Sequence, residues 1–205
     1  MRVLIACEYS GRVRDAFIKL GHDAMSCDLL PTELPGPHYQ GDVRDVVDAV
    51  RQSHGQGWDL IIAHPPCTFM ANSGAKHLYA GMKKENGRNE PRWAEMHKAA
   101  EFFLLLWNLP IPKKAIENPI MLGHAKSLIG VKQTCVIQPH QFGHGETKAT
   151  CLWLQNLPLL IPTNQVEGRE GKCHAMPPSP DRWKNRSRTY QGIADAMAAQ
   201  WGEKK

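Results

Sequence analysis

The stretch RVLIACEYSGRVRDAFIKLGHDAMSCD, residues 2–28, decides the fold of this chain. It opens with the apolar run RVLIAC, which is typical of a buried strand. Apolar residues then recur at helical spacing, at Val13, Ala16, Phe17 and Leu20. Gly21 follows as a helix C-cap, and HDAMSCD is a second short strand that ends at Asp28. The stretch therefore predicts a strand, a helix and a second strand in the same sheet.

The alternation continues along the chain. Residues 41–52 place four valines on one helical face, and WDLIIAH, residues 58–64, is a further apolar strand. A strong helix follows over residues 91–109, with Pro91 in its first turn, and KKAIENP over residues 113–119 is the next strand. Apolar strands that alternate with helices are typical of a parallel sheet covered on both faces. We therefore predict an α/β fold with a doubly wound, mostly parallel sheet.

The remaining segments complete a single domain over residues 1–205. Two strands are expected over residues 133–139 and 147–154, one of them antiparallel to the rest, before a final amphipathic helix over residues 188–201. Three segments are expected to be loops or irregular: the proline-rich residues 29–40, residues 68–90, and the proline-rich residues at about 155–185.

The composition excludes some classes of protein. With 42% hydrophobic and 22% charged residues, the chain is neither disordered nor a membrane protein, and no apolar run approaches the roughly 18 residues of a spanning helix. The net charge of +5 is compatible with a phosphate-bearing partner, and equally with an ordinary solvated surface. Six cysteines without a CxxC pair indicate a reduced, cytoplasmic protein that does not contact membranes.

Ligands of open α/β sheets bind beyond the carboxyl ends of the strands, so the residues at these ends are the candidates for function. Cys67 stands on a turn that is braced by two prolines, which favours an exposed nucleophile over a packed thiol. Glu117 follows a strand, although an acid at this place could also stabilise a helix N-terminus. Asp28 and Asp42 also follow strands, where acids are common as simple turn residues.

In combination, these motifs resemble the cytosine-5 DNA methyltransferases, and more closely their short phage and prophage-type members. LIACEYSGRVRDAFIKLGH corresponds to the cofactor turn of that family, SCD to its ribose-binding acid and GDVRD to its adenine contact. HPPCTFMANSG is similar to the catalytic loop, and IENP to the pair of residues that holds the target base. TYQGIADAMAAQW resembles the final helix that closes over the cofactor.

The resemblance implies a Rossmann-like methyltransferase fold and S-adenosylmethionine as cofactor. The residues it implies for the cofactor are Cys7, Glu8, Ser10, Gly11, Asp28, Asp42 and Pro65. The catalytic residues it implies are Cys67, Glu117 and Asn118. The substrate residues it implies are Pro66, Thr68, Ser73, Gln138, His140 and Lys148. No metal is implied.

The implied reaction is methyl transfer to carbon 5 of cytosine in DNA. A thiolate from Cys67 adds to carbon 6 and makes carbon 5 nucleophilic, while Glu117 takes up the charge that develops at ring nitrogen 3. Burial is expected to keep Glu117 protonated, or to let it share a proton. The target base would first leave the DNA stack. The expected location is the cytoplasm of a bacterial host cell.

Other interpretations stay open at this point. The large target-recognition region of the family is missing, because only residues 159–185 lie between CLWLQNLP and RSRTYQG. The chain could therefore need a separate specificity partner, act on a free pyrimidine nucleotide, or be a non-catalytic nucleic-acid-binding module. HPPC also resembles the loop of amino-methyltransferases, with Phe69 as the stacking aromatic. A weaker alternative is a zinc site built from His140, His144, Cys151, Cys173 and His174.

Overall fold

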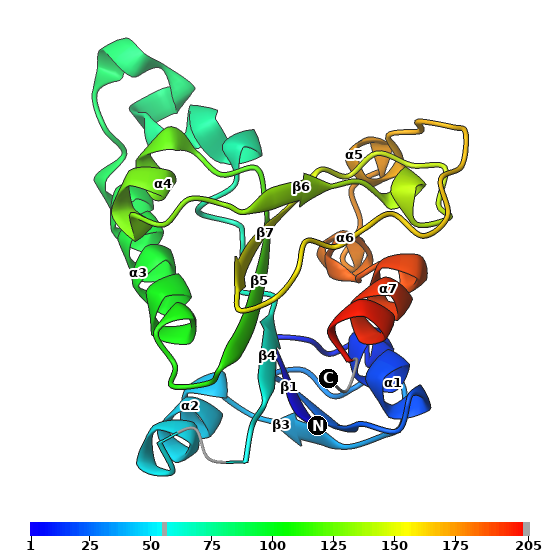
Figure 1. Cartoon of the computed structure of the whole chain (residues 1–205). Coiled ribbons are helices and arrows are strands. Elements are labelled where there is room, and N and C mark those ends of the chain that lie inside the picture. The colour runs from blue at the N-terminus through cyan, green and yellow to red at the C-terminus, as the bar shows by residue number, and fades with distance from the viewer. Residues whose placement is uncertain (55–56, 203–205) are drawn as a thin grey trace.

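The computed structural model describes residues 1–54 and 57–202. Within these residues, a seven-stranded sheet runs in the order β3-β2-β1-β4-β5-β7-β6 (Figure 1). The strands are β1 (Arg2–Ala6), β2 (Asp23–Asp28), β3 (His38–Gln40), β4 (Leu60–Ala63), β5 (Lys113–Pro119), β6 (Cys135–Ile137) and β7 (Thr150–Gln155). Neighbours from β3 to β5 pair in parallel, whereas β7 is antiparallel to both β5 and β6. The predicted sheet, with one antiparallel strand near its end, is confirmed.

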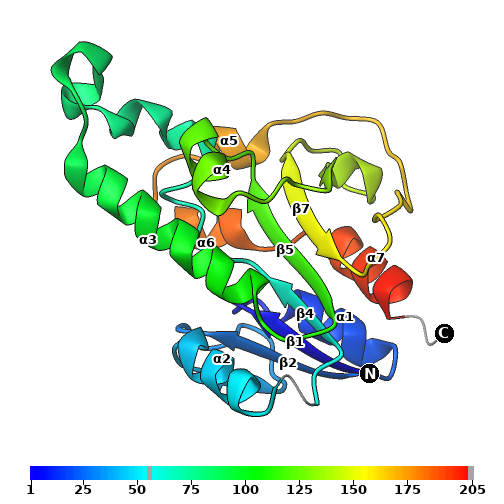
Figure 2. The same ribbon diagram turned by 60° about the vertical axis from the view of Figure 1, so that its left-hand side comes forward.

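Helices cover both faces of the sheet (Figures 1 and 2). One face packs against α2 (Val43–Gln52), α3 (Glu90–Trp107) and α4 (Gly123–Ile129). The other face packs against α1 (Arg12–Lys19) and α7 (Gln191–Trp201). None of the helices in the described parts of the chain has the length and apolarity that crossing a bilayer requires.

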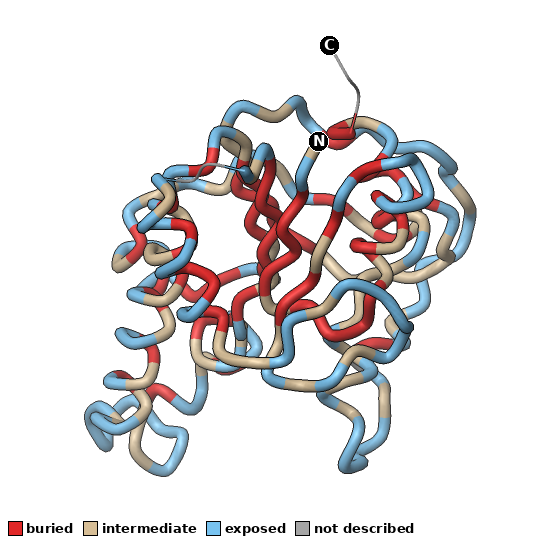
Figure 3. The backbone as a smooth tube through the Cα atoms, turned by 90° about the horizontal axis from the view of Figure 1, so that it is seen from below, coloured by how far each residue is buried: buried red, intermediate tan, exposed pale blue. Residues whose placement is uncertain are grey.

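The alternation of side chains along the strands explains the two layers of core. In β1, Leu4 and Ala6 join the cluster beneath α2 and α3, whereas Val3 and Ile5 join the cluster beneath α1 and α7. All four side chains are fully buried, and the central strands form the buried centre of the molecule in Figure 3. Strands that are buried on both faces need the continuous apolar runs found in the sequence.

Three segments depart from the sequence-based expectations. Residues 38–40 were expected in a loop but form β3, because they pair with Ser26–Asp28 of β2. The segment at about 155–185 was expected to be irregular but contains two short helices, α5 (Lys172–Ala175) and α6 (Arg182–Ser187). The expected loop over residues 68–90 contains the three 3-10 turns Asn72–Leu78, Ala80–Met82 and Lys84–Asn86. Helix α4 was not predicted at all.

Backbone hydrogen bonds hold the carboxyl ends of three strands together. The amide of Glu8 donates to the carbonyl of Cys27 at 3.1 Å, and the amide of His64 donates to the carbonyl of Ala6 at 2.9 Å. The turns after β1, β2 and β4 are therefore fixed to one another at a single edge of the sheet, where ligands of such sheets bind.

Candidate active site

The turn after β4 holds Cys67 in a fixed place. The amides of Met70 and Ala71 donate to the carbonyl of Cys67 at 3.0 and 2.9 Å, which closes the turn. From α3, Arg92 donates to the carbonyl of Thr68 at 2.6 Å, and its guanidinium lies 4.4 Å from the centre of the Phe69 ring. The thiol is thus presented on a rigid turn, and Cys67 itself is half-buried.

Asn118 ties this turn to the end of β5. Its side-chain amide donates to the carbonyl of Pro65 at 3.0 Å, and only 1% of the residue is exposed. Its side-chain oxygen is buried and has no partner among the described residues. The bond between Asn118 and Pro65 places the end of β5, and with it Glu117, directly beside the Cys67 turn.

Glu117 and His64 form a buried pair. The Nδ1 of His64 donates to Oε2 of Glu117 at 2.9 Å, and the two side chains are 8% and 16% exposed. Burial by itself raises the pKa of Glu117, but the hydrogen bond and charge of His64, together with Lys148, lower this pKa below its ordinary value. Burial alone would favour a protonated Glu117, and His64 and Lys148 act against it; of the two expected states, a proton shared with His64 agrees with the geometry.

The Cys67 thiol lies in the field of these groups. Its pKa is raised, first by burial and then by the nearby charge of Glu117. Two cations, Lys148 and Arg186, act in the opposite direction and lower this pKa. The thiol, the carboxylate and the two cations are thus close enough to influence each other, although they come from segments far apart in the sequence.

Lys148 reaches this edge from the segment before β7. Its backbone amide donates to Oε1 of Gln138 at 3.0 Å, and its Nζ donates to the carbonyl of Arg186 at 2.7 Å. A very small cavity of about 10 Å³ lies where Glu117, Lys148 and Tyr190 meet. Lys148 therefore lies beside Glu117 at this edge of the sheet, while the Gln138 side chain holds the backbone around it.

The remaining predicted substrate residues are placed less closely. Pro66, Thr68 and Ser73 are exposed, on the Cys67 turn and on the 3-10 segment that follows it. His140 is half-buried beyond β6, and its Nδ1 is buried without a partner among the described residues. These four residues do not hydrogen-bond through their side chains to Cys67 or Glu117 in the described structure.

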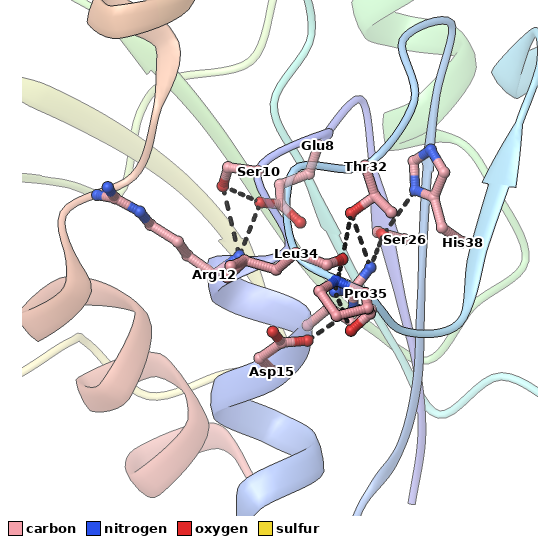
Figure 4. Close-up of polar contacts among 10 residues, drawn as sticks. Glu8, Ser10, Arg12, Asp15, Ser26, Thr32, Leu34, Pro35 and His38 are labelled. Atoms are coloured by element: carbon pink, nitrogen blue, oxygen red, sulfur yellow. Dashed lines mark hydrogen bonds and ion pairs between the residues drawn. The ribbon is translucent and has the colours of Figure 1, made fainter.

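The predicted cofactor turn is closed by its own side chains (Figure 4). Glu8 is only 5% exposed, and its Oε1 accepts from the hydroxyl of Ser10 and, at 3.2 Å, from the amide of Arg12. Gly11 has a φ of 77°, and a Cβ at this position would come within 2.5 Å of the Arg14 guanidinium. The one glycine that the turn retains is thus the one that its backbone conformation requires.

A buried arginine supports this turn from below. Arg14 is fully buried, and it donates to the carbonyl of Leu34 at 2.8 Å and to the hydroxyls of Ser26 and Thr32 at 3.2 and 3.1 Å. It is also paired with Asp15 at 2.7 Å. Arg14 thereby ties helix α1 to β2 and to the loop after it, so that the backbone around Gly11 cannot shift freely.

The two predicted cofactor acids differ in what they already bind. Asp28 accepts from the amide of Leu30 at 3.0 Å, and burial raises the pKa of its carboxyl group. Asp42 caps α2 by accepting from the amide of Arg44 at 2.9 Å, and it also pairs with the Arg44 guanidinium at 3.0 Å. Cys7 has a φ of 59°, and burial raises the pKa of its thiol. Asp42 thus has a structural role whether or not it meets a cofactor.

Three residues at this edge were not predicted to take part: His64, Arg186 and Arg14. The sequence contained a signal for His64, because this residue directly follows an apolar strand. In the sheet, that strand pairs with β5, which carries Glu117 near its end. The sequence contained no such signal for Arg186, because only the folding of the segment around α6 brings this residue near Cys67. From the sequence, Arg14 was expected to be an ordinary polar residue on a helix surface. In the structure it is fully buried, and it hydrogen-bonds to the loop after β2.

The zinc interpretation gains no support from the described side chains. Among them, no group of three or more His, Cys, Asp or Glu residues is arranged to hold a metal ion. The side chain of His174, which belonged to that hypothesis, lies outside the described residues.

No protein-family model and no curated protein matches the sequence. Among solved structures, the chain is similar to a protein of E. coli that is assigned as a prophage-encoded DNA modification methyltransferase. The TM-score is 0.50 and the identity 13%, over 82% of this chain and 52% of the other. Two weaker matches, each at 15% identity, are the methyltransferase EhMeth of Entamoeba histolytica and the Dnmt2 methyltransferase of S. pombe. Their TM-scores are 0.47 and 0.46, and they cover 81% and 85% of this chain and 57% and 54% of theirs.

The first of these similarities concerns the fold alone. Together with the mostly parallel seven-stranded sheet, it shows that the chain has a Rossmann-like α/β fold. The chain spans about half the length of the solved structures that it matches.

Proposed function

We propose that the protein is an S-adenosylmethionine-dependent methyltransferase that modifies carbon 5 of cytosine in DNA, through a covalent bond to Cys67. The observation that carries the proposal is the buried pair of His64 and Glu117, which lies at the end of β5 close enough to Cys67 to shift its pKa. A packing thiol has no need of a buried carboxylate and two cations around it. A perturbed cysteine beside a carboxylate at the carboxyl edge of such a sheet is the arrangement expected of a catalytic site.

The cofactor turn fits the proposed cofactor. Glu8 offers a buried oxygen, Oε2, that has no partner among the described residues and is suited to an ammonium group. Gly11 lets the backbone approach a ligand closely, and Asp28 stands at the next strand end, where it can accept from ribose hydroxyls. When bound, S-adenosylmethionine supplies a methyl group on a sulfonium centre, which is reactive toward a carbon nucleophile.

In this proposal, each residue of the site has its own role in the reaction. The Cys67 thiol loses its proton to water as its sulfur forms a bond to carbon 6, and the electron pair of the ring double bond makes carbon 5 nucleophilic. The Nδ1 proton of protonated His64 moves to Glu117, and Glu117 delivers a proton to ring nitrogen 3, so that His64 becomes neutral and Glu117 stays a carboxylate. Once carbon 5 carries the methyl group, it loses its proton to water, and the returning double bond expels the Cys67 thiolate. Ring nitrogen 3 returns its proton through Glu117 to His64.

Asn118 acts as a positioning residue in this proposal. Because its amide donates to the Pro65 carbonyl, it fixes the distance between the Cys67 turn and the Glu117 strand and is not needed at the base itself. Lys148 and Arg186 stabilise the thiolate, since both lower the pKa of Cys67.

The test is nucleoside analysis of DNA from cells that express the protein, beside cells that express Cys67→Ser. We expect 5-methylcytosine that depends on the wild-type chain and is absent with the variant. Methylation on the exocyclic amine instead of carbon 5 would overturn the cytosine-5 assignment and favour the amino-methyltransferase interpretation.

A free pyrimidine nucleotide is a second candidate substrate. The segment between β7 and α7, residues 156–190, is short and largely irregular, and it offers little surface for reading a DNA sequence. Purified protein incubated with cofactor and deoxycytidine monophosphate would then release a 5-methylated nucleotide, whereas DNA under the same conditions would stay unmodified.

A further inference from the structure

A basic cavity of about 250 Å³ lies next to the catalytic edge. Its wall is formed by the segment over residues 172–190 together with the start of α1 and the approach to β7. The charged residues that line it are Arg12, Glu146, Lys148, Lys172, Arg186 and Arg188. Five of these six side chains are therefore cations, which makes the cavity a site for an anion.

Two of the cations are already neutralised by carboxylates of the protein. Lys172 pairs with Glu170 at 3.0 Å, and Arg188 forms a two-pronged ion pair with Glu33. The only acid of the lining, Glu146, accepts from the hydroxyl of Tyr190 at 2.8 Å. None of these carboxylates is within ion-pair distance of the remaining three cations in the described part of the chain.

Arg12, Lys148 and Arg186 are these remaining cations. Arg12 donates to the carbonyl of Thr189 at 2.9 Å, and Lys148 donates to the carbonyl of Arg186. For Arg186, the Nε is buried, and it has no hydrogen-bond partner among the residues described. None of the three forms an ion pair among the described residues, and a ligand that supplies a close negative charge would stabilise such partly buried cations.

The cavity is continuous with the proposed chemistry. Lys148 lines both this cavity and the small one beside Glu117, and Lys148 and Arg186 both act on the charge of Cys67. An anion held here would therefore belong to the same molecule as a base held between Cys67 and Glu117. The volume is below the roughly 300–1,000 Å³ of sites that enclose a whole drug-sized ligand, so it suits one small charged group.

We propose that this cavity is a phosphate subsite, in which Arg12, Lys148 and Arg186 bind the phosphate of the target nucleotide. Guanidinium groups match the oxygens of a phosphate, and they bind it with charge-assisted hydrogen bonds. The inference rests on the proposed function, because that function makes the ligand a pyrimidine nucleotide. The phosphate is either the monoester of a free nucleotide or a diester of the DNA chain.

Calorimetric titration of the full chain without cofactor tests the subsite. The ligands are deoxycytidine, deoxycytidine monophosphate and a short single-stranded oligonucleotide with one cytosine. We expect a phosphate-bearing ligand to bind about tenfold or more tightly than deoxycytidine, in line with hydrogen bonds to a charged group. We expect Arg186→Gln to remove that difference, with Arg12→Gln as a second variant in case the first does not fold.

Lys184→Gln is the matched control, because Lys184 is a cation of the same helix, α6, that does not line the cavity. Tighter binding of the monophosphate identifies a monoester, and tighter binding of the oligonucleotide alone identifies a diester. Equal binding of all three ligands would overturn the subsite, and so would an equal effect of Arg186→Gln and Lys184→Gln. Phosphate-dependent binding without any methyl transfer would support the subsite and refute the proposed function.

Discussion

The ligand-binding edge of the sheet has two ends, the cofactor turn after β1 and the proposed catalytic end with Cys67 and Glu117. They differ in how many of their buried polar atoms have a hydrogen-bond partner among the described residues. At the cofactor turn, Ser10, Glu8 and the Arg12 amide bind one another, and Arg14 bonds to the surrounding loop. At the catalytic end, buried atoms of His64 and Asn118 stay without partners among the described residues.

Buried polar atoms are nearly always hydrogen-bonded, so a cluster of buried polar atoms without hydrogen-bond partners needs an explanation. At the proposed catalytic end, the unpaired atoms belong to His64, which hydrogen-bonds to Glu117, and to Asn118, which hydrogen-bonds to the carbonyl of Pro65. At the cofactor turn, the single unpaired atom is Oε2 of Glu8. In the first turn most polar atoms already bind one another, whereas in the second more of the buried polar atoms have no partner among the described residues, as the proposed substrate site requires.

Replacing Cys67 by serine should have the largest effect. The variant lacks a nucleophile that can add to carbon 6, so we expect methyl transfer to fall by roughly a thousandfold or more. Binding of S-adenosylmethionine, measured by calorimetry, should stay unchanged, because the thiol belongs to the other end of the edge. Loss of cofactor binding in this variant would show that the two ends are not separate.

Replacing Glu117 by glutamine should have the next largest effect. Glutamine cannot pass on a proton, so we expect the rate to fall about a hundredfold. His64→Gln keeps a hydrogen-bond donor for Glu117 but carries no ionisable proton, and we expect a loss of about tenfold.

The pH dependence of the rate separates the role of His64 from simple packing. His64 lowers the pKa of Glu117, so this pKa should be higher in His64→Gln. Because Glu117 must then carry the proton for ring nitrogen 3 by itself, we expect the rate of the variant to be highest at acidic pH and to fall as Glu117 ionises. If the profile of His64→Gln does not move, the pair has only a structural role.

The two acids of the cofactor end should respond differently. Asp28→Ala should weaken cofactor binding about tenfold, because it removes an acceptor for a ribose hydroxyl. Asp42→Ala removes the cap of α2 and should mainly cost about 1 kcal/mol of the free energy of unfolding. Calorimetry and thermal unfolding of both variants measure these effects. Equal losses of cofactor affinity would show that Asp42 also contacts the ligand.

The smallest expected effect concerns the reactivity of the free thiol. Burial and then Glu117 raise the pKa of Cys67, so alkylation by iodoacetamide should be slow at neutral pH and should rise only in the alkaline range. In Glu117→Gln the negative charge is gone, and the rise should begin at lower pH. Peptide mass spectrometry separates Cys67 from the other five cysteines. Full reactivity of Cys67 at neutral pH would contradict this description of the site.

The sequence was sufficient for most of the fold because the elements follow local rules. The continuous apolar strands and the spacing of Val13, Ala16 and Phe17 predicted the parallel sheet and its first helix, which the structure confirms. The strand β3 was missed because its three residues have no apolar pattern and are strand only through pairing with β2. The helices α5 and α6 were missed because they are short and lie in a proline-rich segment.

The candidate site was predictable only where its residues stand at strand ends. Cys67, Glu117 and Lys148 follow or precede strands, and the structure brings these three residues together. The place of Arg186 could not be predicted, since it depends on how the largely irregular segment of residues 156–190 returns over the sheet. The sequence did not identify His64 as the partner that lowers the pKa of Glu117, because this contact joins two strand ends and burial alone does not predict it.

The most direct test of the central claim is covalent trapping with DNA that carries 5-fluorocytosine. Fluorine replaces the proton that must leave carbon 5, so the bond to the thiol cannot break once the methyl group has been transferred. With S-adenosylmethionine present, we predict a stable adduct of the protein and DNA, with peptide mass spectrometry placing the bond on Cys67. Cys67→Ser should give no adduct. The account would be contradicted if ordinary DNA were methylated while the fluorinated DNA formed no adduct, or if the adduct formed at another residue.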